Sequence, residues 1–382
     1  MTASIPTLDS MLSEGFTKRM AEEYLSILER ERTCGLFDDD YMAWSHAHGF
    51  CAESAYAYGL TENNVEHYLS DYDYWRLWPL NGWQRIWIND KLTLHAILRD
   101  SELAHYLPNY FYYTDKRGLL PLAGPDTPMG MEGFLAMLRE QGEFACKPCN
   151  GAEASGFHKL ACHDGTYVID GAEATEDDVQ AFVDANPNYV FQEFLRPAPQ
   201  MAAINPLIHT IRMLVINETG IDPKPMASYL RFSMEASEDG FAPNYVPPTK
   251  ADICSYDVEI DPLTGRFGNG KLAYANRVVD SPTHPGSGTL VEGTIECWPE
   301  VLDMLHRIAL KVGACEYLGF DVGITTKGPK IMEINSHSGI KYLQLFGPIW
   351  DNEPLAAYFR KKLAELDALT PAQTAARNAV VR

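Results

Sequence analysis

Apolar residues recur every three or four positions in the first third of the chain. Over residues 8–32 this spacing predicts an amphipathic helix, and a second helix is predicted over residues 38–58. Residues 61–90 are instead rich in tryptophan and tyrosine, which is typical of side chains packed in a core or between domains. The pattern therefore predicts a largely helical N-terminal region over residues 1–87.

From residue 88 onward, short runs of β-branched and aromatic residues alternate with helical segments. Helices are predicted over residues 92–98, 131–141, 175–186, 299–318 and 353–369. Strands are predicted over residues 107–113, 143–148, 157–161, 167–169, 189–195, 210–216 and 227–232. Residues 236–250 and 262–271 have the composition of loops, and the tail at residues 370–382 is expected to be frayed. These elements predict an α+β fold.

The sequence of residues 317–339 predicts two short strands joined by a tight turn at Lys327-Gly328-Pro329. Side chains in a strand have a period of two, so Glu333 and Asn335 lie on one face of the second strand. Asp321 of the first strand can point to the same place. Two carboxylates and an amide oxygen form the hard-oxygen site that Mg²⁺ prefers when it also holds phosphates. The alternative is a β-hairpin with ordinary solvated acids.

A lysine and two glycines mark a second candidate site. The strand that ends near Lys147 is followed by a small-residue loop with Gly151 and Gly156, which can place backbone N–H groups and a positive charge against a polyphosphate. The spacing differs from the Walker pattern, because no Gly-Lys-Ser/Thr opens a helix here. Farther along, the extended segment at residues 192–195 can offer an adenine its backbone N–H and C=O groups. Taken singly, each feature is also common as an ordinary loop or strand end.

Composition narrows the classes of protein that these sites fit. Hydrophobic residues make up 46% and charged residues 22%, which is typical of a soluble globular protein. The formal net charge of −21 argues against non-specific binding to nucleic acid or to anionic lipid. The chain contains no apolar run of about 20 residues, which a membrane span needs. Its first residues lack the basic start and apolar core of a signal peptide, so we expect a cytoplasmic protein.

The eight cysteines lack the paired spacing of a zinc site. Cys146 and Cys149 form a single C-x-x-C, and no second pair follows it. We therefore expect free thiols in a reducing compartment.

The order of the candidate segments along the chain resembles the ATP-grasp superfamily, and most closely the sugar-transfer-associated ATP-grasp family. The segments that carry the resemblance lie between residues 88 and 345. They are Asn89-Asp90-Lys91, Lys147-Pro148 with Gly151, Gln192-Glu193-Phe194, Thr210-Ile211-Arg212, His284-Pro285 with Ser287-Gly288, Gly293 with Trp298-Pro299, and the stretch from Gly319 through Asp321 and Glu333 to Gly339. This chain departs from the family at Tyr245-Val246-Pro247-Pro248, where a Gly-Gly is usual, and at Ser338, where many relatives carry proline. Its N-terminal region is helical, where many relatives have a small parallel-sheet domain.

The resemblance implies an ATP-grasp fold, in which two α+β subdomains clamp ATP. The ATP-grasp domain would span residues 88–369, with the nucleotide-clamping subdomain at about 140–196. Phosphates would contact Lys91, Lys147, Gly151 and Gly156, and the adenine would contact Gln192, Glu193, Phe194 and Leu195. One or two Mg²⁺ ions, or Mn²⁺, would be bound by Asp321, Glu333 and Asn335. Arg212, together with Lys147, would act on the transferring phosphoryl group, and substrate would contact Arg231, Asn244, His284, His337 and Ser338.

The function implied is an ATP-dependent ligase, which activates a carboxylate as an acyl phosphate and joins it to an amine. Its partners would be small-molecule carboxylate and amine substrates. A phosphotransferase that gives a stable phospho-product, or a non-catalytic nucleotide-binding module, remains as the alternative. The aromatic residues at 72–87 leave room for a homodimer contact.

Overall fold

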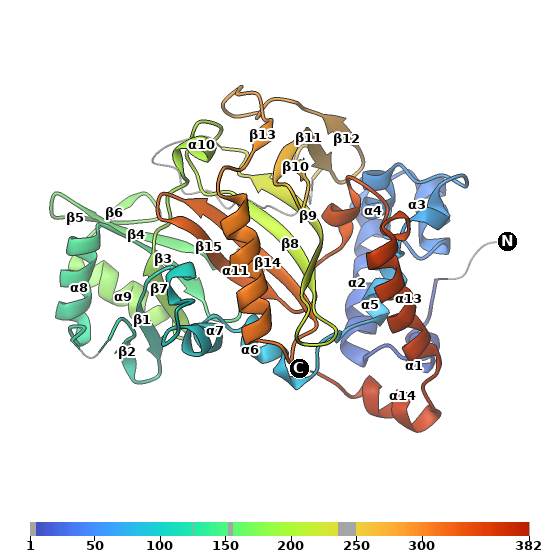
Figure 1. Ribbon diagram of the computed structural model, residues 1–382, viewed down its shortest axis with the longest axis horizontal. Coiled ribbons are helices and arrows are strands. Elements are labelled where there is room, and N and C mark those ends of the chain that lie inside the picture. The colour runs from blue at the N-terminus through green and yellow to red at the C-terminus, as the bar shows by residue number, and fades with distance from the viewer. Residues whose placement is uncertain (1–4, 125, 152–155, 236–249, 382) are drawn as a thin grey trace.

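The computed structural model describes residues 5–124, 126–151, 156–235 and 250–381 of the 382-residue chain. It contains two antiparallel sheets, which we call sheet A and sheet B. Figure 1 shows sheet A at one end of the molecule, sheet B in the middle and N-terminal helices at the other end. None of the helices in these described ranges is long and apolar enough to cross a membrane.

The N-terminal region consists of short helices. They are α1 (Leu8–Ser13), α2 (Lys18–Cys34), α3 (Asp39–Ala47), α4 (Ala52–Tyr58), η1 (Val65–His67), α5 (Asp71–Arg76), η2 (Trp83–Arg85) and α6 (Ile86–Asn89), followed by α7 (Lys91–Leu98) and η3 (Ala104–Tyr106). The predicted helix over residues 8–32 is divided, because Gly15 adopts φ +91° and Thr17 then caps α2. The predicted helix over residues 38–58 is divided at Gly49, where φ is +78°. Both predictions are right about helical structure and wrong about its continuity.

Sheet A has seven strands. In spatial order they are β2 (Gly118–Pro121), β1 (Tyr110–Asp115), β7 (Tyr189–Glu193), β3 (Glu143–Pro148), β4 (His158–His163), β5 (Thr166–Ile169) and β6 (Ala172–Ala174). Helices α8 (Gly130–Gln141) and α9 (Glu176–Ala185) cover one face, where Phe134 packs against Phe144 and Phe191. Strand side chains alternate, so Lys147 of β3 points away from these helices to the opposite face.

Sheet B has eight strands. In spatial order they are β12 (Val278–Asp280), β11 (Arg266–Tyr274), β10 (Cys254–Ile260), β9 (Lys224–Phe232), β8 (Thr210–Ile216), β14 (Tyr317–Thr325) and β15 (Gly328–Asn335), and β13 (Gly293–Thr294) pairs with β11. Helix α10 (Pro199–Ala202) lies in the chain that connects the two sheets. The predicted strands at residues 210–216 and 227–232 are therefore neighbours at the centre of the sheet.

Strands β10 and β11 depart from the predictions. Residues 262–271 were expected to form a loop, and no strand was predicted over residues 254–260. Gly270 interrupts the strand pattern of β11, but a side chain there would overlap the Tyr256 hydroxyl of β10. This glycine therefore serves close packing inside a sheet, although a glycine in a sequence more often marks a turn.

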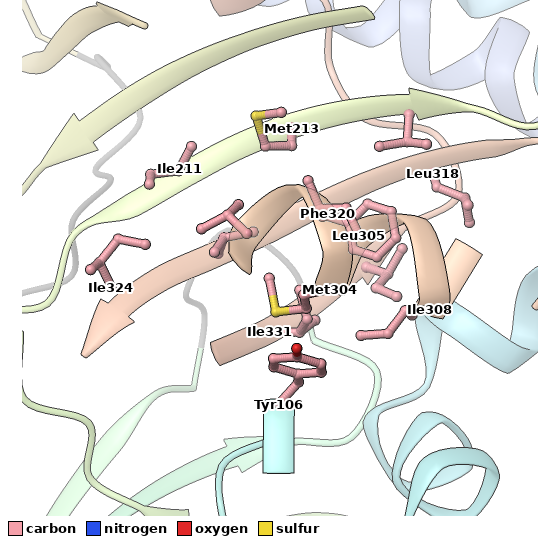
Figure 2. Packing of buried hydrophobic residues seen from close by; sticks show 14 of the residues in the cluster. Tyr106, Ile211, Met213, Met304, Leu305, Ile308, Leu318, Phe320, Ile324 and Ile331 are labelled. Carbon is pink, nitrogen blue, oxygen red and sulfur yellow. The ribbon is translucent and has the colours of Figure 1, made fainter. Parts of the chain in front are cut away.

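Helix α11 (Trp298–Lys311) covers one face of sheet B. Figure 2 shows Met304 and Leu305 of this helix in the same cluster as Met213 of β8 and Phe320 of β14. The helix ends at Lys311 and not at the predicted residue 318, because Gly313 packs against the Gly220 backbone and the chain turns there to enter β14.

The opposite face of sheet B meets the N-terminal region and the C-terminal helices. Its core joins residues of α4 and α5 to α12 (Lys341–Gln344), η4 (Ile349–Asp351) and α13 (Glu353–Asp367). The last helix, α14 (Pro371–Asn378), begins at a capping box on Thr370, so the expectation of a frayed tail is wrong for these residues. Hydrogen bonds from Arg377 to Gly15 and from Asn378 to Leu12 hold α14 against the start of the chain.

The contact between α11 and sheet B predicts unequal effects for two leucines of the same helix. Leu305 is 2% exposed and Leu310 is 39% exposed. Leu305→Ala should lower the free energy of unfolding by about 2–5 kcal/mol, because it leaves a cavity in the core. Leu310→Ala makes the same change in helix propensity at an exposed position, so it should lower the free energy of unfolding by only about 0.5 kcal/mol or less. Urea denaturation of both variants measures the difference, and equal losses would contradict the packing described.

Candidate functional site

Three charged side chains form a row across the last three strands at one edge of sheet B, β8, β14 and β15. In the antiparallel register Asp321 of β14 lies directly opposite Glu333 of β15 on one side and Arg212 of β8 on the other. The neighbours Phe320 and Val322 point to the α11 core, so the row lies on the other face of the sheet. The strand period that placed Glu333 and Asn335 together in the sequence therefore agrees with their positions in the fold.

Each acid of this pair has a cationic partner. Nε and Nη2 of Arg212 donate to the two carboxylate oxygens of Asp321, the second at 3.1 Å. Nζ of Lys91 lies 3.0 Å from Oε2 of Glu333. The amide nitrogen of Asn335 lies 3.4 Å from both Oε1 of Glu333 and the Gly319 carbonyl oxygen. The structure thus brings together the three residues predicted to bind a metal and two of the predicted phosphate and phosphoryl contacts.

The acid pair shares one electrostatic environment. Burial raises the pKa of Asp321 above its usual range; Arg212 opposes the shift, and the neighbouring Glu333 charge adds to it. Burial also acts to raise the pKa of Glu333, but Lys91, a hydrogen bond with Asp321 and the charge of Arg212 together outweigh it and hold that pKa below its usual range. Adjacent carboxylates resist being ionised together, and a divalent cation relieves that repulsion. The donors present therefore fit a hard-oxygen cation such as Mg²⁺.

Lys147 of sheet A faces this acid pair from across the space between the sheets. Burial lowers the pKa of Lys147 to about 8, and the charge of Lys91 adds to the shift, whereas Glu333 and Asp321 oppose it. Its ammonium group also lies 5.5 Å from the centre of the Phe157 ring. Lys91, Lys147 and Arg212 place three positive charges around two carboxylates, which leaves the site suited to an anion.

No other group of acids, histidines and cysteines forms a metal site in the described part of the chain. No three or more of these residue types gather there in a suitable arrangement. Asp321 and Glu333 would therefore need Asn335, phosphate oxygens or water to complete the shell of a cation. Because Mg²⁺ keeps several waters and shares phosphate oxygens in nucleotide sites, two protein carboxylates are sufficient.

Lys91 also contacts the loop that follows Lys147. It opens helix α7, where Asp90 caps the helix by accepting the Thr93 N–H at 2.7 Å. The backbone N–H of Lys91 donates to the Cys149 carbonyl at 2.9 Å, and its Nζ lies 3.4 Å from the Gly151 carbonyl oxygen. Residues 152–155 of the predicted phosphate loop lie outside the described residues. Beyond them Gly156 adopts φ +72°, and a side chain there would clash with the Tyr189 hydroxyl at 2.5 Å.

The residues predicted to hold adenine lie at the end of β7 and just beyond it: Gln192 and Glu193 end the strand, and Phe194 and Leu195 follow it. Gln192 is buried opposite Tyr110, and the Glu193 N–H donates to the Asn109 carbonyl at 2.8 Å. The Glu193 carboxylate forms an ion pair with Lys327, from the turn between β14 and β15. A cavity of about 240 Å³ lies here, between the two sheets; its lining includes Glu193, Phe194, Leu195, Arg196 and residues 325–327.

The predicted substrate contacts are divided between two locations. Arg231 lies near the row, because its guanidinium is 5.0 Å from the Tyr229 ring, which in turn is 6.0 Å from the Arg212 guanidinium. Arg231 is also paired with the buried Asp257 at 2.8 Å. Ser338 contacts the row directly, since its hydroxyl accepts a hydrogen bond from Arg212.

The two predicted histidines lie elsewhere. His284 is buried and bonds to the Ser233 carbonyl at 2.7 Å and to Asn205, within a network of loops. His337 stacks on Tyr74 with the ring centres 4.2 Å apart, and burial lowers its pKa to about 3, so it is neutral. In the described residues, no hydrogen bond joins either histidine to the acid pair. Asn244, the remaining predicted contact, lies outside the described residues.

Sequence reasoning missed the side chains of the N-terminal region that reach this site. Asn81 and Tyr74 hydrogen bond to the segments on both sides of the acid pair. Asn81 precedes a glycine and resembles a turn residue, and Tyr74 is one of many aromatic residues in its stretch. No local signal distinguishes them. Only Asn89, which belongs to the Asn89-Asp90-Lys91 motif, had a signal in the sequence.

A family model described as sugar-transfer associated ATP-grasp matches residues 85–348, which is more than half of the chain. The chain belongs to this family. The predicted family and the predicted ATP-grasp fold, preceded by a helical N-terminal region, are therefore confirmed. No curated protein matches the sequence.

Several solved structures are similar at low identity. The ATP-grasp ligase PsnB complexed with minimal precursor is 15% identical, with a TM-score of 0.37; the match covers 74% of this chain and 62% of PsnB. D-alanine–D-alanine ligase from Bacillus anthracis is 14% identical, with a TM-score of 0.38 and coverage of 78% and 71%. D-alanyl-alanine synthetase A from Vibrio cholerae is 12% identical, with a TM-score of 0.41 and coverage of 74% and 68%. The chain thus spans less than two thirds of the PsnB chain.

The depressed pKa of Lys147 predicts that removing this lysine stabilises the ligand-free protein. The unfolded lysine keeps its proton up to its ordinary pKa of 10.5, but the folded one loses it near pH 8. Between these pH values the unfolded chain binds more protons than the folded protein. Lys147 therefore lowers the free energy of unfolding at pH 7, and this loss becomes smaller as the pH rises. Lys147→Met should therefore raise the unfolding temperature at pH 7, with a smaller gain at pH 10.

A second lysine of sheet A provides the control. Lys159 of β4 is buried but forms an ion pair with Glu143 at 2.6 Å, so Lys159→Met removes one of the two cations, Lys159 and Arg196, that are paired with this partly buried acid. This variant should lower the unfolding temperature. If both variants lower it equally at pH 7, the assigned environment of Lys147 is wrong.

Proposed function

We propose that this protein is an ATP-dependent ligase. It transfers the γ-phosphoryl group of ATP to a substrate carboxylate and then joins the resulting acyl phosphate to an amine, with release of ADP and phosphate. The observation that carries the proposal is the acid pair Asp321–Glu333 between Lys91, Lys147 and Arg212. A site with two carboxylates and three cations provides for both a divalent cation and a polyphosphate, which a site for a simple anion does not need.

The nucleotide would lie between the two sheets. In this proposal, Lys91 and Lys147 bind its phosphates, together with backbone groups at Gly151 and Gly156. Gln192, Glu193, Phe194 and Leu195 hold the adenine at the end of β7, beside the cavity of about 240 Å³. The ATP-grasp domain would then comprise residues 88–369, preceded by the helical N-terminal region of residues 1–87.

Asp321, Glu333 and Asn335 would hold one or two Mg²⁺ ions. When bound, the metal supplies positive charge against the β- and γ-phosphates and fixes their geometry. Lys91 and Arg212 contact these acids in the ligand-free protein. Both side chains are therefore already beside the place where the phosphates would bind.

Arg212 and Lys147 would contact the reacting atoms. A carboxylate oxygen of the substrate attacks the γ-phosphorus, and the bond from that phosphorus to ADP breaks. Arg212 and Lys147 neutralise and orient the phosphoryl oxygens during this step. The amine nitrogen then attacks the acyl carbon, phosphate leaves with the bonding electron pair, and the nitrogen loses a proton. No covalent bond to the protein forms, so none of the eight cysteines needs a catalytic role.

Substrate recognition would use groups beside Arg212. Arg231 lies next to it across the Tyr229 ring, and its guanidinium is 4.1 Å from the Tyr342 ring centre. An Arg between aromatic rings suits a planar anion such as a carboxylate. Arg231, which is also paired with Asp257, therefore remains a candidate substrate contact because of its place beside Arg212, whereas the bonds of His284 lie in a network of loops and favour a structural role.

Replacement of one acid should abolish turnover without unfolding the protein. Glu333→Gln keeps the size of the side chain but removes the charge, so ADP release should fall by about a hundredfold or more. Glu259→Gln, on the same face of sheet B but three strands away from β14, is the matched control and should keep its activity. A coupled ADP-release assay measures both rates, and equal rates would contradict the assigned role of the acid pair.

The reaction class is decided by the mass of the product. We expect ADP release when amino acids, other carboxylates and amines are screened in pairs with Mg²⁺, and loss of this activity when EDTA is added. A ligase product has the summed mass of the acid and amine less one water. A product that has gained a phosphoryl group would establish a phosphotransferase. Nucleotide binding with no ADP release for any pair would favour a binding module.

A further inference from the structure

Side chains of the N-terminal region hold the segment that follows the acid pair. Asn81 donates to the Tyr317 carbonyl at 2.7 Å and accepts from the N–H groups of Glu316 and Tyr317 at 2.8 and 3.0 Å. Asn89 bonds to both the backbone and the hydroxyl of Ser336, at 2.9 and 2.8 Å. These two amides therefore fix the start of β14 and the end of β15, the two strands that carry Asp321 and Glu333.

The same region contacts the chain farther along. Leu69 exchanges hydrogen bonds with the side chain of Gln344, at 2.9 and 3.0 Å, and Glu53 of α4 forms an ion pair with Lys341. Residues 336–344 are thus anchored at several points to residues 53–89. The anchors are directional hydrogen bonds and one ion pair between specific groups, so they set the position of this segment more narrowly than apolar packing alone.

Tyr74 provides the anchor at Ser338. It is 3% exposed, and its hydroxyl donates to the Ser338 carbonyl oxygen. The Tyr317 hydroxyl lies 2.9 Å from that of Tyr74 and 3.1 Å from the same carbonyl oxygen. Burial, with the neighbouring Tyr317 hydroxyl, raises the pKa of Tyr74 well above its usual value, so its proton stays available for donation.

Ser338 in turn contacts the guanidinium of Arg212. Nη1 of Arg212 donates to the Ser338 hydroxyl, while Nε and Nη2 are bound to Asp321. On the sheet side, Ser338 lies so close to Gly319 that any side chain at residue 319 would overlap it. Ser338 is therefore held from one side by β14 and from the other by Tyr74.

We infer that Tyr74 is a positioning residue, which sets the orientation of the Arg212 guanidinium through Ser338. The inference rests on the proposed function only where it uses turnover, since Arg212 would then orient the transferring phosphoryl group. The hydrogen bonds to Asp321 and Ser338 involve all three nitrogens of the planar Arg212 guanidinium and so fix its orientation. A shift of Ser338 rotates this plane, and reaction rates are sensitive to displacements of about 1 Å.

The test compares two tyrosines of the same region. Tyr74→Phe keeps the ring that stacks on His337 but removes the hydroxyl. Tyr41→Phe removes a hydroxyl that bonds to the Ala55 and Leu60 carbonyls at 3.1 and 2.9 Å, away from Ser338. Each variant loses two hydrogen bonds of a tyrosine hydroxyl: in Tyr74→Phe those to the Ser338 carbonyl and the Tyr317 hydroxyl, and in Tyr41→Phe those to two backbone carbonyls. The unfolding temperature should therefore fall by similar amounts in both.

Turnover should separate the two variants. Tyr74→Phe should lower kcat for ADP release about tenfold with KM for ATP within about twofold, because the orientation of Arg212 matters most in the transition state. Tyr41→Phe should match the wild type. In Ser338→Ala the link to Arg212 is absent, so adding Tyr74→Phe should lower kcat no further. Equal kcat values for Tyr74→Phe and Tyr41→Phe would overturn the inference. So would a Ser338→Ala/Tyr74→Phe double variant whose fold-loss in kcat equals the product of the two single losses.

A measurement without turnover distinguishes this inference from the proposed function. The NMR resonance of the Arg212 Nε–H group, assigned by its loss in Arg212→Lys, reports the orientation of the guanidinium in the ligand-free protein. It should shift in Tyr74→Phe and stay in place in Tyr41→Phe. If it stays in place in both, the inference fails even when the wild type releases ADP. If it shifts as expected but no substrate pair gives ADP, only the proposed function fails.

Discussion

Two carboxylates on adjacent strands cannot both be buried and ionised unless cations surround them. Asp321 and Glu333 lie opposite each other in the register of β14 and β15, and each cation near them belongs to a different element. Arg212 comes from β8, Lys91 from α7 and Lys147 from sheet A. The charge balance of the acid pair therefore depends on the correct placement of both sheets and of the helix between them, which links local electrostatics to the whole fold.

The sequence is most informative where a function depends on local periodicity. The hairpin at residues 317–335 and the common face of Glu333 and Asn335 follow from the strand period and one turn, and Lys147 follows from its position at the end of a strand. The roles of these residues stay predictions. The resemblance to a family, now confirmed over residues 85–348, adds Lys91 and Arg212, whose contacts span 242 and 109 positions of the chain respectively.

Features that depend on contacts between distant parts of the chain could not be predicted from the sequence. The breaks at Gly15 and Gly49 arise from single positive-φ residues inside helical patterns, and β11 contains a glycine that is required by Tyr256. His337 follows the metal strand directly, yet it packs on Tyr74 of the N-terminal region. A sequence gives the neighbours of a residue along the chain. It does not give the distant element that will cover that residue. The hydrogen bonds of Tyr74 and Asn81 join distant parts of the chain, so they could not be predicted.

The net charge of −21 has a consequence for how a nucleotide reaches the cleft. Under the proposed function, the acidic surface would repel a polyphosphate at long range, and Lys91, Lys147 and Arg212 would attract it only within about one Debye length, which is about 8 Å in physiological salt. The electric field would therefore oppose the first approach of the nucleotide and favour its binding once it is close to these three cations. Dissolved ions weaken the outer repulsion first, because the inner charges are shielded from solvent, so under the proposed function moderate salt would speed the arrival of nucleotide.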